Sequence, residues 1–389
     1  MTCASSNFPK RLQKTKFCNV AVFSFDALSF VPAWQNRLQR LVPTIAMMDQ
    51  DSYNGPSATE GQRAPRPTLK TIAYMTGLGI TTISRALNDA PDIGADTKKR
   101  VRLVADQIGY RPNRAGVRLR TGKTNVISLI LSLDEEVLGL TSQLVLGISE
   151  ALANTGYHLI VTPYDRAKDP LDPVRYVVET ESADGVILSA TQDQDKRVQY
   201  LLEKNFPVAT HGRTGLGPTH AYYDFDNETY ARKGVELLHA RGRSRLALIA
   251  PSALYLYAQH MTKGFVDAME RFELLEIPIR SIHIDTPFDI LQAEIERLMR
   301  SRHRPDGIIC GNGGSALTAA VAIEAAGLKV GVDVDLVTKH SAEVIRRVRP
   351  EIFTINEDFR KAGNHLARSL METIAGKSVA ELQFLEVPE

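Results

Sequence analysis

The sequence predicts an α/β protein: a small all-α helix-turn-helix headpiece plus two doubly wound parallel-sheet subdomains with a ligand cleft between them. Short amphipathic helix patterns occupy residues 67–112. From residue 124 onward, short apolar runs alternate with helical stretches. The two parts also differ in charge. Residues 67–123 carry 11 Lys and Arg against 4 Asp and Glu, whereas residues 124–389 carry 28 Lys and Arg against 37 Asp and Glu. A basic helical module is therefore joined to an acidic α/β body.

The length and composition of the chain exclude several classes of protein. A chain of 389 residues exceeds what one hydrophobic core usually serves, so several domains are expected. The three cysteines, Cys3, Cys18 and Cys310, are too few for a disulfide framework or a zinc site and suit a reducing cytoplasm. No apolar run has the length of a membrane span. We expect a cytoplasmic protein without a metal or other cofactor.

Residues 1–66 have an unusual composition. Residues 17–34 are rich in Phe and Val and follow four basic residues, which is one pattern of a signal peptide, but Asp26 interrupts the apolar run. Residues 49–67 are polar and rich in Gly, Pro and Ser. We expect residues 1–66 to be a disordered extension or a mis-annotated start, with the true start at Met47 or Met48.

Residues 67–112 carry the pattern of a helix-turn-helix DNA-binding domain. Apolar residues at i, i+3 and i+4 give one helix face from Leu69 and a second from Ile83, and Gly77 between them suits a tight turn. The second helix of such a motif enters the major groove. Its outward positions are Ile80, Thr81, Thr82, Ser84, Arg85 and Asn88. A third, basic helix is expected near residues 96–108. A purely structural three-helix bundle is the alternative, but a merely solvated face would favour Glu and Lys over these short polar groups.

Residues 113–123 are expected to form a short hinge helix. Asn113 can cap it, and residues 111–123 contain five basic residues and no acidic one. Leu119 is a large apolar residue on this basic helix, which is the composition of a minor-groove wedge. A two-turn helix is marginal alone, so it should order only when a partner or DNA holds it. A flexible linker with a chance Leu is the alternative.

Residues 124–389 are expected to form the body of the protein. Apolar strand-like runs occur at residues 126–131, 157–162, 183–190, 208–212, 245–250, 306–312 and 335–339. Continuous apolar strands between helices indicate parallel sheets covered on both faces. Ligands bind such sheets at the carboxyl ends of the strands. The polar residues at these ends are Tyr164, Asp165, Arg166, Ser189, Thr191, His211, Arg213, Asn312, Lys339 and His340.

Enzymatic signals are weak. Residues 311–315, GNGGS, follow a strand and open a helix, as a nucleotide-phosphate loop does. No Lys-Ser or Lys-Thr follows, and the spacing is not GxGxxG, so a turn on the cleft wall is the better interpretation than a nucleotide-using enzyme. The chain has no GxSxG, HExxH, CxxC or paired-carboxylate constellation. We therefore expect that the protein is not an enzyme.

The run TLKTIAYMTGLGITTISRALN at residues 68–88, followed by GYRPNRAGVRLRTGKTNVI at 109–127, resembles the LacI/GalR family of bacterial transcriptional regulators. The resemblance extends to the end of the chain and implies a homodimer on double-stranded operator DNA. It implies that Ile80, Thr81 and Arg85 contact bases, that Thr82, Ser84 and Asn88 help to hold phosphates, and that Leu119 wedges into the minor groove. The DNA-binding set also includes Thr68, Leu69, Thr97, Tyr110, Asn113 and Arg114.

The headpiece departs from the family pattern at three positions. Gly79 and Gly94 stand where the family usually has a capping Ser, which costs a few tenths of a kcal/mol. Gly116 stands where the hinge helix usually has Ala, which costs about 1 kcal/mol of helix propensity. We therefore expect this hinge to order less readily than in relatives.

For residues 124–389, the effector-binding and dimerisation domain, the resemblance implies the periplasmic sugar-binding fold. The cleft residues that it implies are Leu140, Thr141, Arg166, Ser189, Asn312 and Phe359, with Glu357 nearby. Two usual binders of sugar hydroxyls are missing, because Met261 and the run 338–340 replace an Arg and an Asp. The expected substitutes are His211, Arg213, Tyr257, His260 and His340, although each single His could equally be structural. The cationic residues leave a sugar and a sugar phosphate both open as the effector.

The expected function is that of a repressor of carbohydrate-utilisation genes, released from its operator by a small sugar-like effector. YYDFDN at residues 222–227 and ATHGR at 209–213 resemble regulators of α-glucoside or related disaccharide use. The alternative from another class is a periplasmic sugar-binding protein with a retained leader. The basic module at residues 68–123 argues against that alternative.

Overall fold

The computed structural model describes residues 66–111, 116, 118, 122–132, 139–165, 168–340 and 343–389. The expectations for residues 1–65 and for Asn113, Arg114, Leu119 and Arg166 lie outside the described residues. Among the described helices, none is long and apolar enough to cross a membrane.

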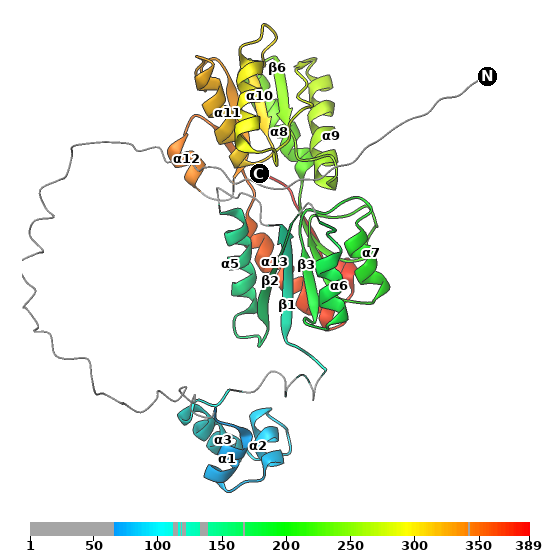
Figure 1. Ribbon diagram of the computed structural model, residues 1–389, viewed down its shortest axis with the longest axis vertical. Coiled ribbons are helices and arrows are strands. Elements are labelled where there is room, and N and C mark those ends of the chain that lie inside the picture. The colour runs from blue at the N-terminus through cyan, green and yellow to red at the C-terminus, as the bar shows by residue number, and fades with distance from the viewer. Residues whose placement is uncertain are drawn as a thin grey trace, which may run out of the picture. The chain divides into compact units, whose positions relative to one another are not determined.

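Three helices form the headpiece (Figure 1): α1 Leu69–Thr76, α2 Ile80–Leu87 and α3 Ala95–Gln107. Their shared core buries Ile72, Ile83, Ala86, Val101 and Ala105. Gly77 ends α1 with a left-handed φ of +69°, which glycine adopts without strain. Thr68 begins α1 through a capping box with Thr71, whereas Gly79 and Gly94 begin α2 and α3 without a side-chain cap. The predicted helix-turn-helix is confirmed.

The first subdomain of the body is built on a six-stranded sheet in the order β11-β5-β4-β3-β1-β2, in which all pairs are parallel. The strands are β1 Val126–Ser132, β2 His158–Tyr164, β3 Gly185–Leu188, β4 Val208–His211, β5 Ala221–Phe225 and β11 Gln383–Glu386. Helices α5 Leu140–Leu152 and α13 Phe359–Ile374 share one apolar cluster with the sheet. Helices α6 Asp172–Glu179 and α7 Lys196–Glu203 share another. The 3-10 turn η2 Val379–Leu382 leads into β11.

The second subdomain repeats this plan with a five-stranded parallel sheet in the order β10-β9-β8-β6-β7. The strands are β6 Arg245–Ile249, β7 Leu275–Glu276, β8 Gly307–Cys310, β9 Asp335–His340 and β10 Phe353–Asn356. Helices α8 Asn227–Ala240 and α9 Leu256–Arg271 pack in one cluster, and α10 Phe288–Met299 and α11 Gly313–Ala325 pack in the other. Helix α12 Val344–Val348 precedes β10. The predicted pair of doubly wound parallel sheets is confirmed.

Two segments carry the chain from one subdomain to the other and back, residues 225–227 and 356–359. The C-terminus then returns to the second subdomain, because Lys233 of α8 donates a hydrogen bond of 2.9 Å to the carbonyl of Pro388. In each subdomain one helix pair crosses at a glycine. A Cβ on Gly363 would lie 2.2 Å from the carbonyl oxygen of Leu144, and one on Gly264 would lie 2.0 Å from that of Glu228. These close crossings fix the helices that flank the crossover segments.

Candidate nucleic-acid interface and ligand cleft

Helix α2 and its C-cap Asn88 carry six of the thirteen predicted DNA-contacting residues. Ile80 is 44% exposed although it is apolar, and Thr81, Arg85 and Asn88 are also exposed. Thr82 and Ser84 are half-buried and so less outward than expected. An exposed apolar residue beside hydroxyl, amide and guanidinium groups is the chemistry that contacts base edges in the major groove.

The remaining predicted headpiece residues lie around this helix. Thr68 is exposed at the start of α1, and Thr97 is half-buried near the start of α3. Leu69 and Tyr110 are half-buried and pack against the headpiece core, so their side chains also stabilise the fold. The DNA contacts expected of these two residues stay a prediction.

Ion pairs order the loop between α2 and α3. Arg85 of α2 contacts Asp92 at 2.6 Å. Lys98 and Arg102 of α3 contact Asp89 at 3.1 and 3.0 Å, and the hydrogen bond from Lys98 is the main cause that lowers the pKa of Asp89. The loop that joins the two helices is thus tied to both.

A cavity of about 260 Å³ lies at the carboxyl ends of strands from both sheets. Of the predicted effector-binding residues, those that line it are Leu140, Thr141, Ser189, His211, Tyr257, Asn312, His340, Glu357 and Phe359. Arg213 and His260 are not among the lining residues. Lys339, named from the sequence as a polar strand-end residue, also lines it, whereas the lining residues Ser132, Asp224, Asn227 and Asp285 were not predicted.

Lys339 is the centre of a buried polar cluster at the end of β9. Its Nζ lies 2.8 Å from Oε2 of Glu357 and donates a hydrogen bond of 2.9 Å to Oδ1 of Asn227. The ammonium group also lies 5.3 Å from the centroid of the Phe225 ring and 5.9 Å from that of Tyr257. Asn227 belongs to the first crossover segment and Glu357 to the second. The Lys339 ammonium group therefore contacts both crossover segments.

A second ion pair joins Arg213 to Asp224, with Nε of the arginine 2.9 Å from Oδ2 of the aspartate. Burial raises the pKa of Asp224 to about 7 although Arg213 opposes this change. His211 packs edge-on against Phe359 with ring centroids 5.0 Å apart. Burial lowers the pKa of His211, so its ring is neutral at pH 7. Glu357 therefore offsets Lys339, Asp224 offsets Arg213 where it is ionised, and His211 adds no charge.

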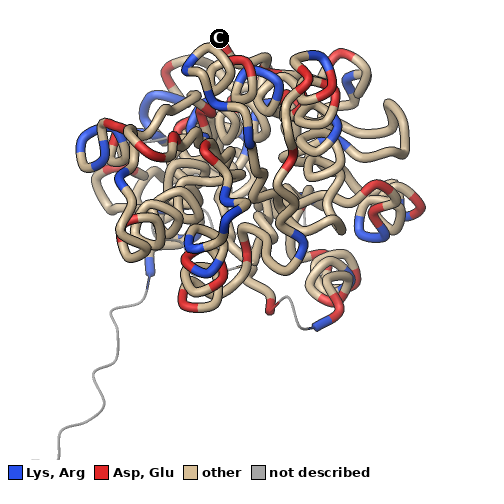
Figure 2. Tube along the Cα trace, turned by 90° about the horizontal axis from the view of Figure 1, so that it is seen from above, with Lys and Arg blue, Asp and Glu red and all other residues tan. Residues whose placement is uncertain are grey.

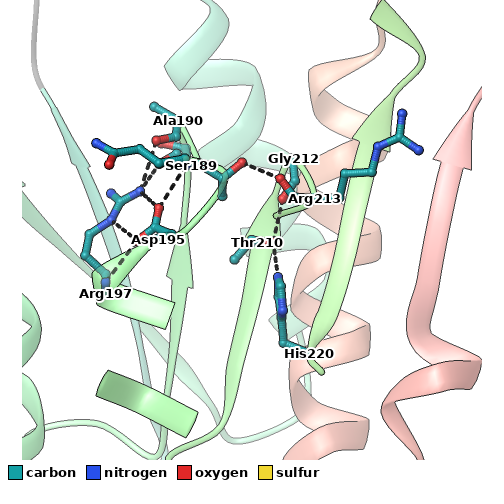
Figure 3. A network of polar contacts seen from close by, with 10 residues as sticks. Ser189, Ala190, Asp195, Arg197, Thr210, Gly212, Arg213 and His220 are labelled. Carbon is teal, nitrogen blue, oxygen red and sulfur yellow. Dashed lines mark hydrogen bonds and ion pairs between the residues drawn. The ribbon is translucent and has the colours of Figure 1, made fainter. Parts of the chain in front are cut away.

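A buried ion pair supports the wall of the cavity that carries Ser189 (Figure 3). Arg197 of α7 bonds both carboxylate oxygens of Asp195, through Nε at 3.0 Å and Nη2 at 2.6 Å. The same Nη2 donates to the carbonyls of Ser189 and Ala190 at 3.2 and 3.0 Å. Ala190 has a φ of +51°, which few non-glycine residues adopt. The guanidinium group thus holds the turn at the end of β3.

Helix N-termini supply further polar groups. Asn312 caps α11, because its Oδ1 accepts a hydrogen bond of 2.8 Å from the amide of Ser315. The GNGGS run is therefore a strand-to-helix turn on the cavity wall, as interpreted from the sequence. Among the described residues there is no group of three His, Cys, Asp or Glu side chains that could hold a metal ion.

The buried His220 makes the free energy of unfolding of the body depend on pH. The ring is 1% exposed, its Nε2 lies 3.0 Å from Oγ1 of Thr210, and burial lowers its pKa to about 4. The unfolded chain binds the proton with a pKa near 6.5, so the free energy of unfolding falls as pH drops from about 6.5 to 4, by up to about 3 kcal/mol. Asp224 acts in the opposite direction, since its raised pKa makes the folded state bind a proton below about pH 7.

Comparing variants isolates the contribution of His220. We expect His220→Gln to lose less of its free energy of unfolding than the unsubstituted protein when urea melts at pH 7 and pH 4.5 are compared. His303→Gln, at an exposed histidine, should behave like the unsubstituted protein. Equal pH dependence in all three proteins would contradict this assignment.

Both the headpiece and the body are similar to parts of known proteins. Residues 68–113 match the family described as bacterial regulatory proteins, lacI family, and residues 124–375 match periplasmic binding proteins and sugar binding domain of LacI family. HTH-type transcriptional regulator AglR of Rhizobium meliloti is 29% identical over 78% of this chain and 86% of the relative. HTH-type transcriptional regulator RafR of Escherichia coli is 29% identical over 82% of this chain and 96% of the relative.

Solved structures show the same fold. The lac repressor dimer bound to operator and the anti-inducer ONPF superposes with a TM-score of 0.72 at 24% identity, over 84% of this chain and 97% of that one. The complex of transcriptional regulator CelR with cellobiose has a TM-score of 0.60 at 23% identity, over 83% of this chain and 98% of that one.

Proposed function

Because the chain belongs to the LacI family of bacterial regulatory proteins, we propose that it is a cytoplasmic, homodimeric repressor of carbohydrate-utilisation genes. One observation carries the proposal: a helix-turn-helix headpiece and a two-subdomain body with a polar cavity occur in one chain. Relatives that match most of the chain are named as transcriptional regulators. The proposed role is regulatory, and it requires no catalysis and no cofactor.

In this proposal each subunit places α2 in the major groove of one half of a palindromic, double-stranded operator. The exposed positions Ile80, Thr81 and Arg85 would contact bases. The net charge of +7 on residues 67–123 would displace counterions from the phosphates, so affinity should fall steeply with salt. Leu119 as a minor-groove wedge stays a prediction.

The effector would act through the crossover segments. A ligand in the cavity touches groups from both subdomains, so it binds one relative arrangement of them better than another and shifts the population toward that arrangement. Lys339 bonds to Asn227 and Glu357, one residue in each crossover segment, so a change in the relative arrangement of the subdomains would alter its contacts. An arrangement that does not suit operator binding lowers the affinity for DNA.

The charges around the cavity favour an uncharged sugar over a sugar phosphate. The lining cation Lys339 is paired with Glu357, with which a phosphate dianion would have to compete, and Arg213 does not line the cavity and contacts Asp224. Sugar hydroxyls, which donate and accept, can instead add to such ion pairs without displacing them. In a thermal-shift series, a neutral disaccharide that binds should raise Tm by several degrees at saturating concentration, and its phosphate ester should not. Tighter binding of the ester than of the parent sugar would contradict this assignment.

The function itself is tested with the full chain and a fluorescent duplex from the promoter next to its own gene. We expect binding at nanomolar protein that unlabelled random DNA does not displace at equal concentration. The sugar found by thermal shift should release the duplex. Binding of the sugar without any sequence preference for DNA would overturn the proposal.

A further inference from the structure

We propose that Asp92 determines the DNA specificity of the headpiece: it holds Arg85 in position for a base and repels DNA that offers Arg85 only phosphates. The inference rests on the proposed function, because it requires Arg85 to face DNA. It adds a residue that contributes to specificity although its charge opposes DNA binding.

The ion pair lies on the exposed face of the headpiece. Nη2 of Arg85, in the last turn of α2, is 2.6 Å from Oδ1 of Asp92, and the two side chains are 53% and 49% exposed. Both groups therefore remain accessible to a partner. Nη2 carries two hydrogens and Nη1 two more, so a guanidinium that keeps this carboxylate can still donate two parallel hydrogen bonds.

The loop that carries Asp92 is built against Arg85. The amide of Ala90 donates a hydrogen bond of 3.0 Å to the carbonyl of Arg85, and the amide of Ile93 donates one of 3.2 Å to the carbonyl of Ala90. Ile93 then packs against the headpiece core. Because the residues on both sides of Asp92 are anchored, its short side chain presents the carboxylate at a fixed place. Arg85 is the long, flexible partner, and the pair limits its orientations.

The strength of this contact suits a selective role. An exposed ion pair contributes between 0 and about 1 kcal/mol, so DNA can break it. On random DNA, Arg85 would turn to a phosphate and leave the Asp92 carboxylate unpaired close to the phosphate backbone, which is unfavourable. On an operator base pair such as G·C, Arg85 donates to the guanine O6 and N7 while it keeps Asp92. The carboxylate therefore weakens binding to the wrong DNA more than binding to the right DNA.

Asp106 offers a matched control. It is exposed in the last turn of α3 and belongs to the same basic module, so Asp106→Asn removes the same charge from the headpiece. Only Asp92→Asn removes the charge that contacts Arg85. A difference between the two variants reports the position of the carboxylate and not the net charge.

The test uses the full chain, an operator selected from a random duplex pool, and a random duplex of equal length. We expect Asp92→Asn to bind random DNA about threefold tighter or more, with a salt slope steeper by about one. Its affinity ratio between operator and random DNA should fall at least as much, whereas Asp106→Asn should keep the ratio. In an Arg85→Ala background, Asp92→Asn should no longer lower the ratio.

The outcomes separate the two proposals. If the unsubstituted chain selects an operator and Asp92→Asn keeps the same ratio, or changes it as Asp106→Asn does, the inference about Asp92 is wrong and the proposed function stands. If the chain selects no preferred sequence, the proposed function is wrong and the inference falls with it.

Discussion

Arg197→Met is expected to lower the free energy of unfolding of the body by about 3–5 kcal/mol, because it leaves the Asp195 carboxylate buried without its partner. The two side chains are 4% and 1% exposed. Burial alone would raise the pKa of Asp195, but the hydrogen bonds and charge of Arg197 outweigh burial and hold that pKa below its ordinary value. The backbone amides of Gln192 and Arg197 also donate hydrogen bonds to this carboxylate, at 3.1 and 3.0 Å, but among the described residues its cationic partner is the Arg197 guanidinium group.

The consequence should reach the cavity as well. Arg197 donates to the carbonyls of Ser189 and Ala190, which form the turn at the end of β3 (Figure 3). Without these bonds, the left-handed φ of Ala190 loses a restraint and Ser189 loses its fixed place on the cavity wall. We expect effector affinity to fall together with stability.

Urea unfolding at pH 7 measures the first effect. Arg175→Met is the matched control, because Arg175 forms ion pairs with Asp169 and Asp172 on the surface and should cost less than about 1 kcal/mol. Asp195→Asn/Arg197→Met should recover much of the loss, since no charge is then left buried. A single Arg197→Met variant as stable as Arg175→Met would show that the pair is not buried in solution.

Arg85→Ala is expected to cost about 1–3 kcal/mol of operator binding and to relax specificity, since it removes the guanidinium group of the outer face of α2. The loss on random DNA should be limited to that of one phosphate contact. Effector binding, measured by calorimetry, should be unchanged because the substitution lies in the headpiece.

Arg102→Ala provides the comparison for Arg85→Ala. Arg102 is an exposed arginine of the same headpiece that contacts Asp89 from α3. Its loss should weaken operator and random DNA alike. If the two variants lose the same affinity on both kinds of DNA, Arg85 does not contact bases.

The headpiece and the class of the body were predictable because their signals are local in sequence. The apolar faces that start at Leu69 and Ile83 do form the headpiece core. The apolar runs at residues 126–131 and 306–312 contain the buried parallel strands β1 and β8. Neighbouring residues alone determine helical or strand periodicity, so one sequence is sufficient to find it.

Four strands were not predicted, namely β5, β7, β10 and β11. β7 has two residues, and β10 and β11 are short and only partly buried, so their apolar patterns are weak. β11 forms because it pairs with β5, which lies about 160 residues earlier in the chain. A strand stabilised by a distant partner leaves little local signal.

The residues of the cavity, too, could be predicted only in part from the sequence. Of the polar residues at the strand ends, those that line it are Ser189, His211, Asn312, Lys339 and His340. The others that the structure describes, Tyr164, Asp165, Thr191 and Arg213, are not among the lining residues. The cationic residues of the sequence left a sugar phosphate open as the effector, whereas in the folded chain charges of both signs are interleaved over the body (Figure 2). Lys339 is offset by Glu357.

The sequence by itself determined a basic helix-turn-helix module joined to a doubly wound α/β body, because periodicity and net charge are properties of neighbouring residues. Only the tertiary structure decided which charged side chains are paired with another side chain of the protein. Lys339 meets Asn227 across 112 residues of chain, and Arg85 meets Asp92 because Ile93 and the ion pairs of Asp89 anchor the loop between α2 and α3. Pairing depends on distances in space, which the order of residues does not state.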